Sequence, residues 1–143
     1  MNFRKIAALC LVTMLLAVLP IWAANTVITT QSPKGPYPGT VSAGQLDLTW
    51  TAADTVNGNA FVMTGHEILL MWNPDASAHT VTISSVSDVR NRTGDVTNYS
   101  IAATTISAFN FVGLTDGWQQ SNGQVYFSAN SNLIKFAIVT EPR

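Results

Sequence analysis

Charge is what this sequence has least of. Charged side chains account for 10% of its 143 residues, whereas about a quarter is typical of a globular domain. The few Lys and Arg residues form no basic patch, which excludes the electrostatic footprint of a nucleic-acid-binding protein. A surface poor in charge and rich in Thr, Ser, Asn and Ala is typical of dense protein–protein packing or of exposure outside the cell.

Cysteine and histidine are almost absent as well. Cys10 is the only cysteine, and it lies in an apolar N-terminal run, so the rest of the chain is held by its core without a disulfide. His66 and His79 are the only imidazoles. Two histidines without a cysteine do not supply the three or four ligands of a zinc site. The sequence therefore predicts neither a metal nor a cofactor.

No motif frames a catalytic centre. The sequence lacks a Gly-x-Ser-x-Gly elbow, the motif that exposes the nucleophilic serine of many hydrolases. Asp88 and Asp95 could pair as glycosidase carboxylates or bind calcium. Arg90 and Arg92 lie between them, however, and a solvent-exposed ion-pair loop explains this pattern better. We expect a protein that is not an enzyme.

Residues 1–23 have the three-part layout of a secretory signal peptide. Arg4 and Lys5 precede a long apolar run, Pro20 ends that run, and small residues at Ala23 offer a cleavage site. We predict an apolar leader helix that is cleaved after Ala23, so that the protein is secreted or lies at the cell surface. An uncleaved membrane anchor is the alternative, because the apolar run approaches the length of a membrane span.

Residues 24–44 form the next segment, which we predict to be an extended arm. The segment begins with the β-branched run Thr26, Val27, Ile28, Thr29 and Thr30. Prolines and glycines follow from Pro33 to Gly39, and they fit neither a helix nor an interior strand. Such an arm could complete a sheet edge of a neighbouring subunit. A simple N-terminal tail is the other interpretation.

Residues 45–143 read as a domain of about eight short strands separated by turn residues. The central pair is a short apolar run, 68–72, and an alternating run, 80–84, joined by a polar loop. The first run is apolar on both faces, which is typical of a central strand covered on both sides. We predict an all-β fold, a single antiparallel β-sandwich that is jelly-roll-like, with no helix outside the leader.

The remaining predicted strands have alternating apolar and polar residues. They cover 45–51, a strand starting at Phe61 and Val62, 96–102, 106–111, 124–128 and 133–139. In 96–102, Tyr99 and Ile101 are expected to be buried. In the last strand, Ile134, Phe136 and Ile138 are expected to point inward and Lys135 outward. Asn122-Gly123 is the strongest hairpin signal in the chain.

The tryptophans raise the question of a sugar-binding surface. Trp50, Trp72, Trp118 and Tyr126 could form an aromatic platform for a sugar ring. Trp50 and Trp72 lie in strands at positions expected to face the core. Trp118 lies beside two glutamines near a turn, and it is the one aromatic residue that we expect to contact a ligand. A carbohydrate-binding module is therefore an alternative function.

Several strand and turn patterns together resemble one family. The residues that carry the resemblance are Thr64 to Asn73, Asp75 to Ile83, Gly94 to Thr97, Ser100 to Ala103, Gly123 to Phe127 and Phe136 to Val139. Their order and spacing resemble small β-sandwich proteins encoded near the capsid genes of tailed bacteriophages, over roughly residues 45–139. The resemblance implies a head decoration, or cement, protein, which clamps neighbouring subunits of a capsid lattice. It implies no catalytic residue, and it makes the virion the alternative location.

These observations favour an exported, non-enzymatic structural protein. We expect its β-sandwich to pack into or onto a larger assembly, such as a surface lattice, a filament or a decorated capsid. The expected partner is protein, either copies of the same chain or a repeating protein lattice. We expect no nucleic-acid partner, and contact with a membrane only through an uncleaved leader.

Overall fold

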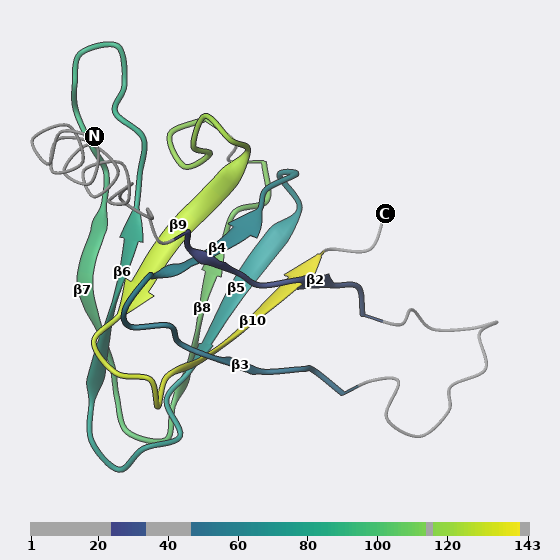
Figure 1. Cartoon of the computed structure of the whole chain (residues 1–143), viewed down its shortest axis with the longest axis vertical. Coiled ribbons are helices and arrows are strands. Elements are labelled where there is room, and N and C mark those ends of the chain that lie inside the picture. Colours follow the sequence, from purple (N-terminus) through teal and green to yellow (C-terminus); the bar gives the residue numbers. More distant parts are fainter. Residues whose placement is uncertain (1–23, 34–46, 114–115, 141–143) are drawn as a thin grey trace, which may run out of the picture.

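The computed structural model describes residues 24–33, 47–113 and 116–140, which form an all-β protein of ten strands in two sheets (Figure 1). The predicted leader, 1–23, and residues 34–46 of the predicted arm lie outside the described residues. The residues that the structure describes contain no helix whose length and hydropathy would let it span a bilayer.

The first sheet has five strands. In spatial order they are β1 (Thr26–Val27), β4 (Asn59–Val62), β9 (Gln124–Ala129), β6 (His79–Ser84) and β7 (Val96–Ile101). All neighbouring pairs are antiparallel except β1 and β4, which are parallel. The sheet is therefore antiparallel, with a short parallel strand added at one edge.

The second sheet also has five strands. Its main order is β2 (Thr30–Gln31), β10 (Lys135–Thr140), β5 (Glu67–Trp72) and β8 (Ile106–Asn110), and β3 (Thr51–Ala52) pairs with the beginning of β10. The β2–β10 pair is parallel and the others are antiparallel. One continuous segment, β1 to β2, thus adds a parallel strand to each sheet.

The core lies between the two sheets, where alternate residues of each strand point inward. Phe136 and Ile138 of β10 are fully buried, as is Ile134 before the strand, which confirms the predicted register. The rings of Phe136 and Phe127 meet edge to face across the two sheets, with centroids 4.7 Å apart. Burying each such side chain contributes about 1.5–3 kcal/mol to stability. The fold is therefore sandwich-like.

The strand β5 is central in its sheet, as the sequence predicts, since it pairs with β10 on one side and β8 on the other. Its inward residues are buried, but its outward face is only half-buried. Trp72 lies on that outward face with Trp50 beside it, ring centroids 5.4 Å apart. The core positions predicted for Trp50 and Trp72 are therefore wrong, because both rings lie outside the buried cluster.

Of the predicted strand 45–51, residues 45 and 46 lie outside the described residues, 47–50 are not in a strand, and Thr51 belongs to β3, which contains Thr51 and Ala52. Immediately before it, the backbone N–H and C=O of Thr49 bond to the side-chain amide of Gln31, at 2.7 and 2.8 Å. This amide satisfies the backbone polar groups that an adjacent strand would otherwise satisfy. Apolar and polar residues do alternate in this segment, but at Thr49 the Gln31 side chain makes the hydrogen bonds that a neighbouring strand would make in a sheet.

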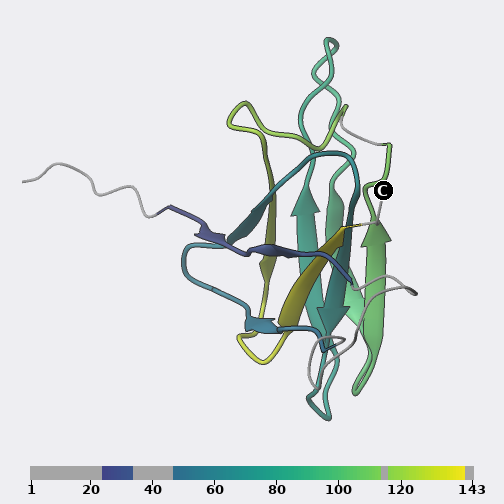
Figure 2. The same cartoon turned by 90° about the vertical axis from the view of Figure 1, so that its right-hand side faces the viewer.

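The chain crosses repeatedly between the sheets, as from β4 to β5 to β6 and from β7 through β8 and β9 to β10. Only β6 and β7 are consecutive neighbours in one sheet, and their connecting loop extends beyond the body of the fold (Figures 1 and 2). The Asn122-Gly123 turn forms, with Gly123 N–H donating to Gln120 O. The segment before this turn, 116–121, is irregular, so the turn precedes β9 without joining it to a second strand in a hairpin.

Candidate functional site

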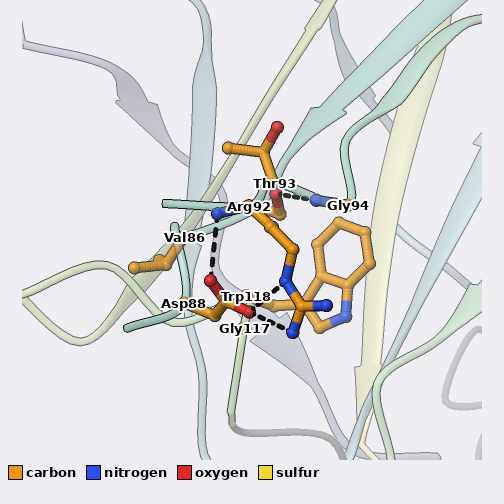
Figure 3. A pocket seen from close by; sticks show the side chains of 8 residues that line it. Val86, Asp88, Arg92, Thr93, Gly94, Gly117 and Trp118 are labelled. Atoms are coloured by element: carbon orange, nitrogen blue, oxygen red, sulfur yellow. Dashed lines mark hydrogen bonds and ion pairs between the residues drawn. The ribbon is translucent and has the colours of Figure 1, made fainter. Parts of the chain in front are cut away.

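A hollow of about 430 Å³ lies at the base of the β6–β7 loop, where that loop meets the turn before Trp118 (Figure 3). The lining residues are Ser85, Val86, Asp88, Arg92, Thr93, Gly94, Gly117 and Trp118. The backbone N–H of Val86 donates to the Gly117 carbonyl at 2.6 Å and joins the two walls. The hollow thus brings together a projecting loop and the one tryptophan predicted to contact a ligand.

Asp88 organises the loop. One carboxylate oxygen accepts the backbone N–H groups of Arg90 and Arg92, and the other pairs with the Arg92 guanidinium at 2.6 Å (Figure 3). The backbone N–H of Arg92, and then its side chain, lower the pKa of Asp88. Both side chains are exposed enough to be well hydrated, so the pair shapes the loop rather than stabilising the fold.

Asp95 does not join Asp88. Its carboxylate accepts the backbone N–H and the hydroxyl of Ser85, at 2.6 and 2.7 Å, and these bonds lower its pKa. Asp88 therefore closes a turn within the loop, whereas Asp95 joins the two ends of the β6–β7 loop. The 2.6 Å contact between Arg92 and Asp88 confirms the ion-pair interpretation for these two residues.

Trp118 is half-buried and fixed by aromatic packing. Its ring lies edge to face against Phe109 at 5.2 Å and Phe111 at 5.8 Å, and it borders the hydrophobic core. Its neighbour Gln119 donates to the Met63 carbonyl at 2.9 Å. The indole is therefore a rigid wall of the hollow, and it contributes to the core at the same time.

The histidines are held apart from one another. His79 Nε2 lies 2.8 Å from a carboxylate oxygen of Asp75, and this hydrogen bond is the main cause of the lowered pKa of Asp75. His66 lies just before β5 and donates its backbone N–H to Glu67. Among the described residues, no three His, Cys, Asp or Glu side chains come close enough to hold a metal ion. Sequence reasoning missed the His79–Asp75 pair, because a spacing of four residues brings side chains together on a helix, whereas these two residues meet across a loop.

Glu67 is a buried carboxylate that the sequence did not single out. It accepts four hydrogen bonds, from the backbone N–H groups of Thr64, Gly65 and His66 and from the Thr64 hydroxyl. Burial alone would raise its pKa, but these donors outweigh burial and keep the pKa below its usual value. Because its oxygens are already occupied by the adjacent turn, Glu67 holds the entry to β5 in place.

The predicted arm residues lie on their own domain. Thr26 and Val27 pair with β4, Ile28 is buried, Thr29 is exposed, and Thr30 begins β2 beside β10. We call this flank, where β1 and β2 lie along β4 and β10, the arm side. The segment is extended, as expected, and its first contacts are with the same chain.

The opposite flank, which we call the open side, is where β7 and β8 end their sheets. Between them lies an apolar groove of about 200 Å³. Its lining residues are Met71, Val81, Ile83, Val96, Tyr99, Ala108 and Phe109. Sequence reasoning placed Tyr99 in the core, but its side chain is 48% exposed at this edge.

Comparison of the chain with protein-family models, with curated proteins and with solved structures found no match. The fold is all-β, and the two candidate sites within the described residues are a hollow with one aromatic wall and an Asp88–Arg92 ion pair, and a groove lined by apolar side chains between two sheet edges.

Proposed function

We propose that this chain is an exported, non-enzymatic structural protein that packs into or onto a larger assembly. The two sheets would act as a β-sandwich, jelly-roll-like in the way the chain passes from one sheet to the other. Its partner is protein, either copies of itself or a repeating lattice. The single observation that carries the proposal is an unprotected sheet edge at β8 on the open side.

As far as the described residues show, the edge at β8 lacks the features that prevent sheet edges from pairing with one another. Within the described residues β8 pairs only with β5, and its sequence, Ile-Ser-Ala-Phe-Asn, has no charge and no proline. Ile106 at its start is 55% exposed. Soluble proteins usually protect such edges with lysine, proline, bulges or a covering segment, because an open edge accepts another strand. An edge without them suits a protein whose edge is covered by a partner.

Two further features support a role without catalysis. The carboxylates of Glu67, Asp88 and Asp95 are each engaged by neighbouring donors, so none is positioned as a free general acid or base. The low charge of the sequence and the resemblance to head decoration proteins point in the same direction. Secretion or display at the cell surface follows from the predicted leader, and a virion location follows from the resemblance.

The test places a charge at the β8 edge. Ile106→Lys and Ala108→Lys should abolish assembly, because a lysine along an edge strand opposes pairing with a second strand. Val62→Lys is the matched control: Val62 is 53% exposed, but it lies on β4, between β1 and β9. Sedimentation of the purified proteins measures the loss. Equal assembly of Ile106→Lys, Ala108→Lys and Val62→Lys would refute the proposed interface.

A second candidate function is carbohydrate binding at the hollow. The hollow contains the kinds of groups that bind a sugar ring. The exposed part of the Trp118 indole could stack on the ring, and the Asp88–Arg92 pair and the hydroxyls of Ser85 and Thr93 could bond to its hydroxyl groups. Trp118→Ala should then abolish retention on a polysaccharide column. Because Trp118 also packs on Phe109, Arg92→Gln serves as a second variant that spares the core. No retention of the parent protein would exclude this function.

A further inference from the structure

We infer that residues 24–33 are an exchangeable arm, which in the assembly occupies on a neighbouring copy the same place that it occupies here on its own domain. This inference rests on the proposed function and names the partner as a second copy of this chain. It concerns the arm side, and so a different surface from the β8 edge.

The arm binds its domain through a compact set of contacts. Thr26 N–H donates to Gly58 O and Ile28 N–H to Ala60 O, and the Thr26 hydroxyl donates to Asp54 at 2.7 Å. Between the two short ladders, Ile28 inserts into the core and is only 4% exposed. The arm therefore combines one apolar anchor with hydrogen bonds on both sides of it.

The second half of the arm is bound equally specifically. Thr30 and Gln31 pair with Ile138 and Val139 of β10. The Gln31 side chain makes two hydrogen bonds with the backbone of Thr49. The partners of the arm thus come from β4, β10 and residues 49–58, all of which belong to the domain proper (Figure 2). None of these contacts depends on which chain supplies the arm.

Only residues 34–46 connect the arm to the domain. These thirteen residues reach at most about 45 Å when fully extended. Exchange of an identical element between protomers keeps every contact of that element and changes only the connecting segment. The closed form, with the arm on its own domain, and the exchanged form, with the arm on a neighbouring copy, therefore make almost the same contacts. The local concentration of neighbouring domains then determines which form is populated.

The site cannot be left empty without cost. Removing the arm would uncover the edges of β4 and β10 together and would open the place of Ile28 in the core. In an assembly that holds copies side by side, the arm of a neighbour can fill this site. Because it has the same sequence, it can pair with β4 and β10 in the same register. Each copy then gives one arm and receives one, which links copies into a continuous array.

Two single-cysteine variants test the exchange in the full chain, with Cys10→Ser to remove the native thiol. Gln31→Cys and Val139→Cys occupy directly paired positions of β2 and β10, where the Cα separation of adjacent strands permits a disulfide. The two variants are mixed, unfolded, refolded together, allowed to assemble and oxidised. Complete exchange between randomly chosen copies in an equal mixture predicts that about half of the chains run as a covalent Gln31→Cys/Val139→Cys dimer on a non-reducing gel, and that this dimer disappears with reductant.

Val27→Cys with Ala60→Cys provides a second paired test if the first pair folds poorly. A mixture of Gln31→Cys with Val62→Cys is the control, because Val62 is exposed and is not paired with the arm. The chain carrying both Gln31→Cys and Val139→Cys separates the two forms directly. Exchange predicts a ladder of covalent oligomers from it, whereas a retained arm closes a disulfide within one chain.

The outcomes distinguish this inference from the proposed function. Assembly in which the double variant forms only the internal disulfide, and the mixed variants form no covalent dimer above the control, would overturn exchange and leave the structural role intact. A wild-type chain that remains monomeric at every concentration would overturn exchange, and it would leave a repeating lattice of another protein as the partner in the proposed function.

Discussion

The arm side and the open side of this fold differ in whether further strands cover their sheet edges. On the arm side, β1 and β2 extend the edges of β4 and β10, and β3 covers the beginning of β10. On the open side, β7 and β8 end their sheets with an apolar groove between them. Within the described residues, the chain thus covers one pair of edges with its own strands, and the other pair is where we propose that a partner binds.

The two edges of the open side also differ from each other. In β7 an extra residue interrupts the ladder with β6, so that Val81 pairs with Tyr99 but Ile83 pairs with Val96. Asn98, within this bulge, has a φ of 50° and donates its N–H to the Thr82 hydroxyl. A bulge twists an edge away from further pairing. β8 pairs with β5 in an uninterrupted register, and it is therefore the better acceptor of a strand.

Among the predicted changes in stability, we expect the largest when Ile28, the buried residue of the arm, is truncated. Ile28→Ala should lower the free energy of unfolding by about 2–5 kcal/mol, the usual cost of truncating a buried isoleucine. Val27→Ala, at an adjacent position that is 51% exposed, should change it by less than about 0.5 kcal/mol. Urea denaturation measures both. Equal effects at the two positions would mean that the arm does not dock through Ile28.

Acid should weaken the arm side. The backbone N–H and side chain of Asn57, with the Thr26 hydroxyl, lower the pKa of Asp54 far below its usual value. A carboxyl whose pKa is lower in the folded state contributes stability above its unfolded pKa, near about 3.9, and loses that contribution as the pH falls toward the folded pKa. Protease cleavage within the arm should therefore increase below about pH 4.

Asp54→Asn is the matched variant for this prediction. It removes the titrating group but keeps the size of the side chain, so arm cleavage should already be faster at neutral pH and should change less on acidification. Limited proteolysis at several pH values, followed by mass spectrometry, measures the effect. An identical pH profile for Asp54→Asn and the parent would assign the acid sensitivity to other carboxylates.

A smaller effect is expected when the bulge in β7 is removed. Deleting Asn98 leaves Thr82 opposite Thr97 and restores one-to-one pairing with β6, since Val81 pairs with Tyr99 and Ile83 with Val96. The straightened β7 should then accept a strand more readily, and the assembly should sediment at a lower protein concentration than the parent. A deletion variant that folds and assembles no better would show that β7 takes no part in assembly.

The strands inside the two sheets could be predicted from the sequence. Alternation predicted β6 and the inward register of β10, and the apolar run predicted the central place of β5. These strands lie inside their sheets, where side-chain pattern and burial agree. Prediction failed at the edges: Tyr99 is exposed, and residues 47–50 of the strand expected at 45–51 are not in a strand.

The polar residues that hold the fold were harder to predict. Asn73 is fully buried after β5, and its side-chain amide donates to the carbonyls of Ser77, Ile101 and Ala102. Glu67, before β5, is bound by the backbone of its own turn. The bonds from Asn73 to Ile101 and Ala102 join residues far apart in the chain, so spacing along the chain does not reveal them. The bonds to Glu67 come from residues 64–66, and they depend on the conformation of that turn. The sequence singled out Trp118 and the loop that contains Asp88 and Arg92, but it did not predict that they line the same hollow, because they come together only in the fold.

The central claim, that this chain works as part of a repeating assembly, is tested most directly on protein recovered from its native source. Electron microscopy of the fraction gives its state of assembly, and the intact mass of the same fraction gives the start of the chain. The account predicts chains beginning at Ala24 in ordered filaments or a surface lattice. Monomeric chains outside any ordered structure, at concentrations equal to those in the source, would contradict it.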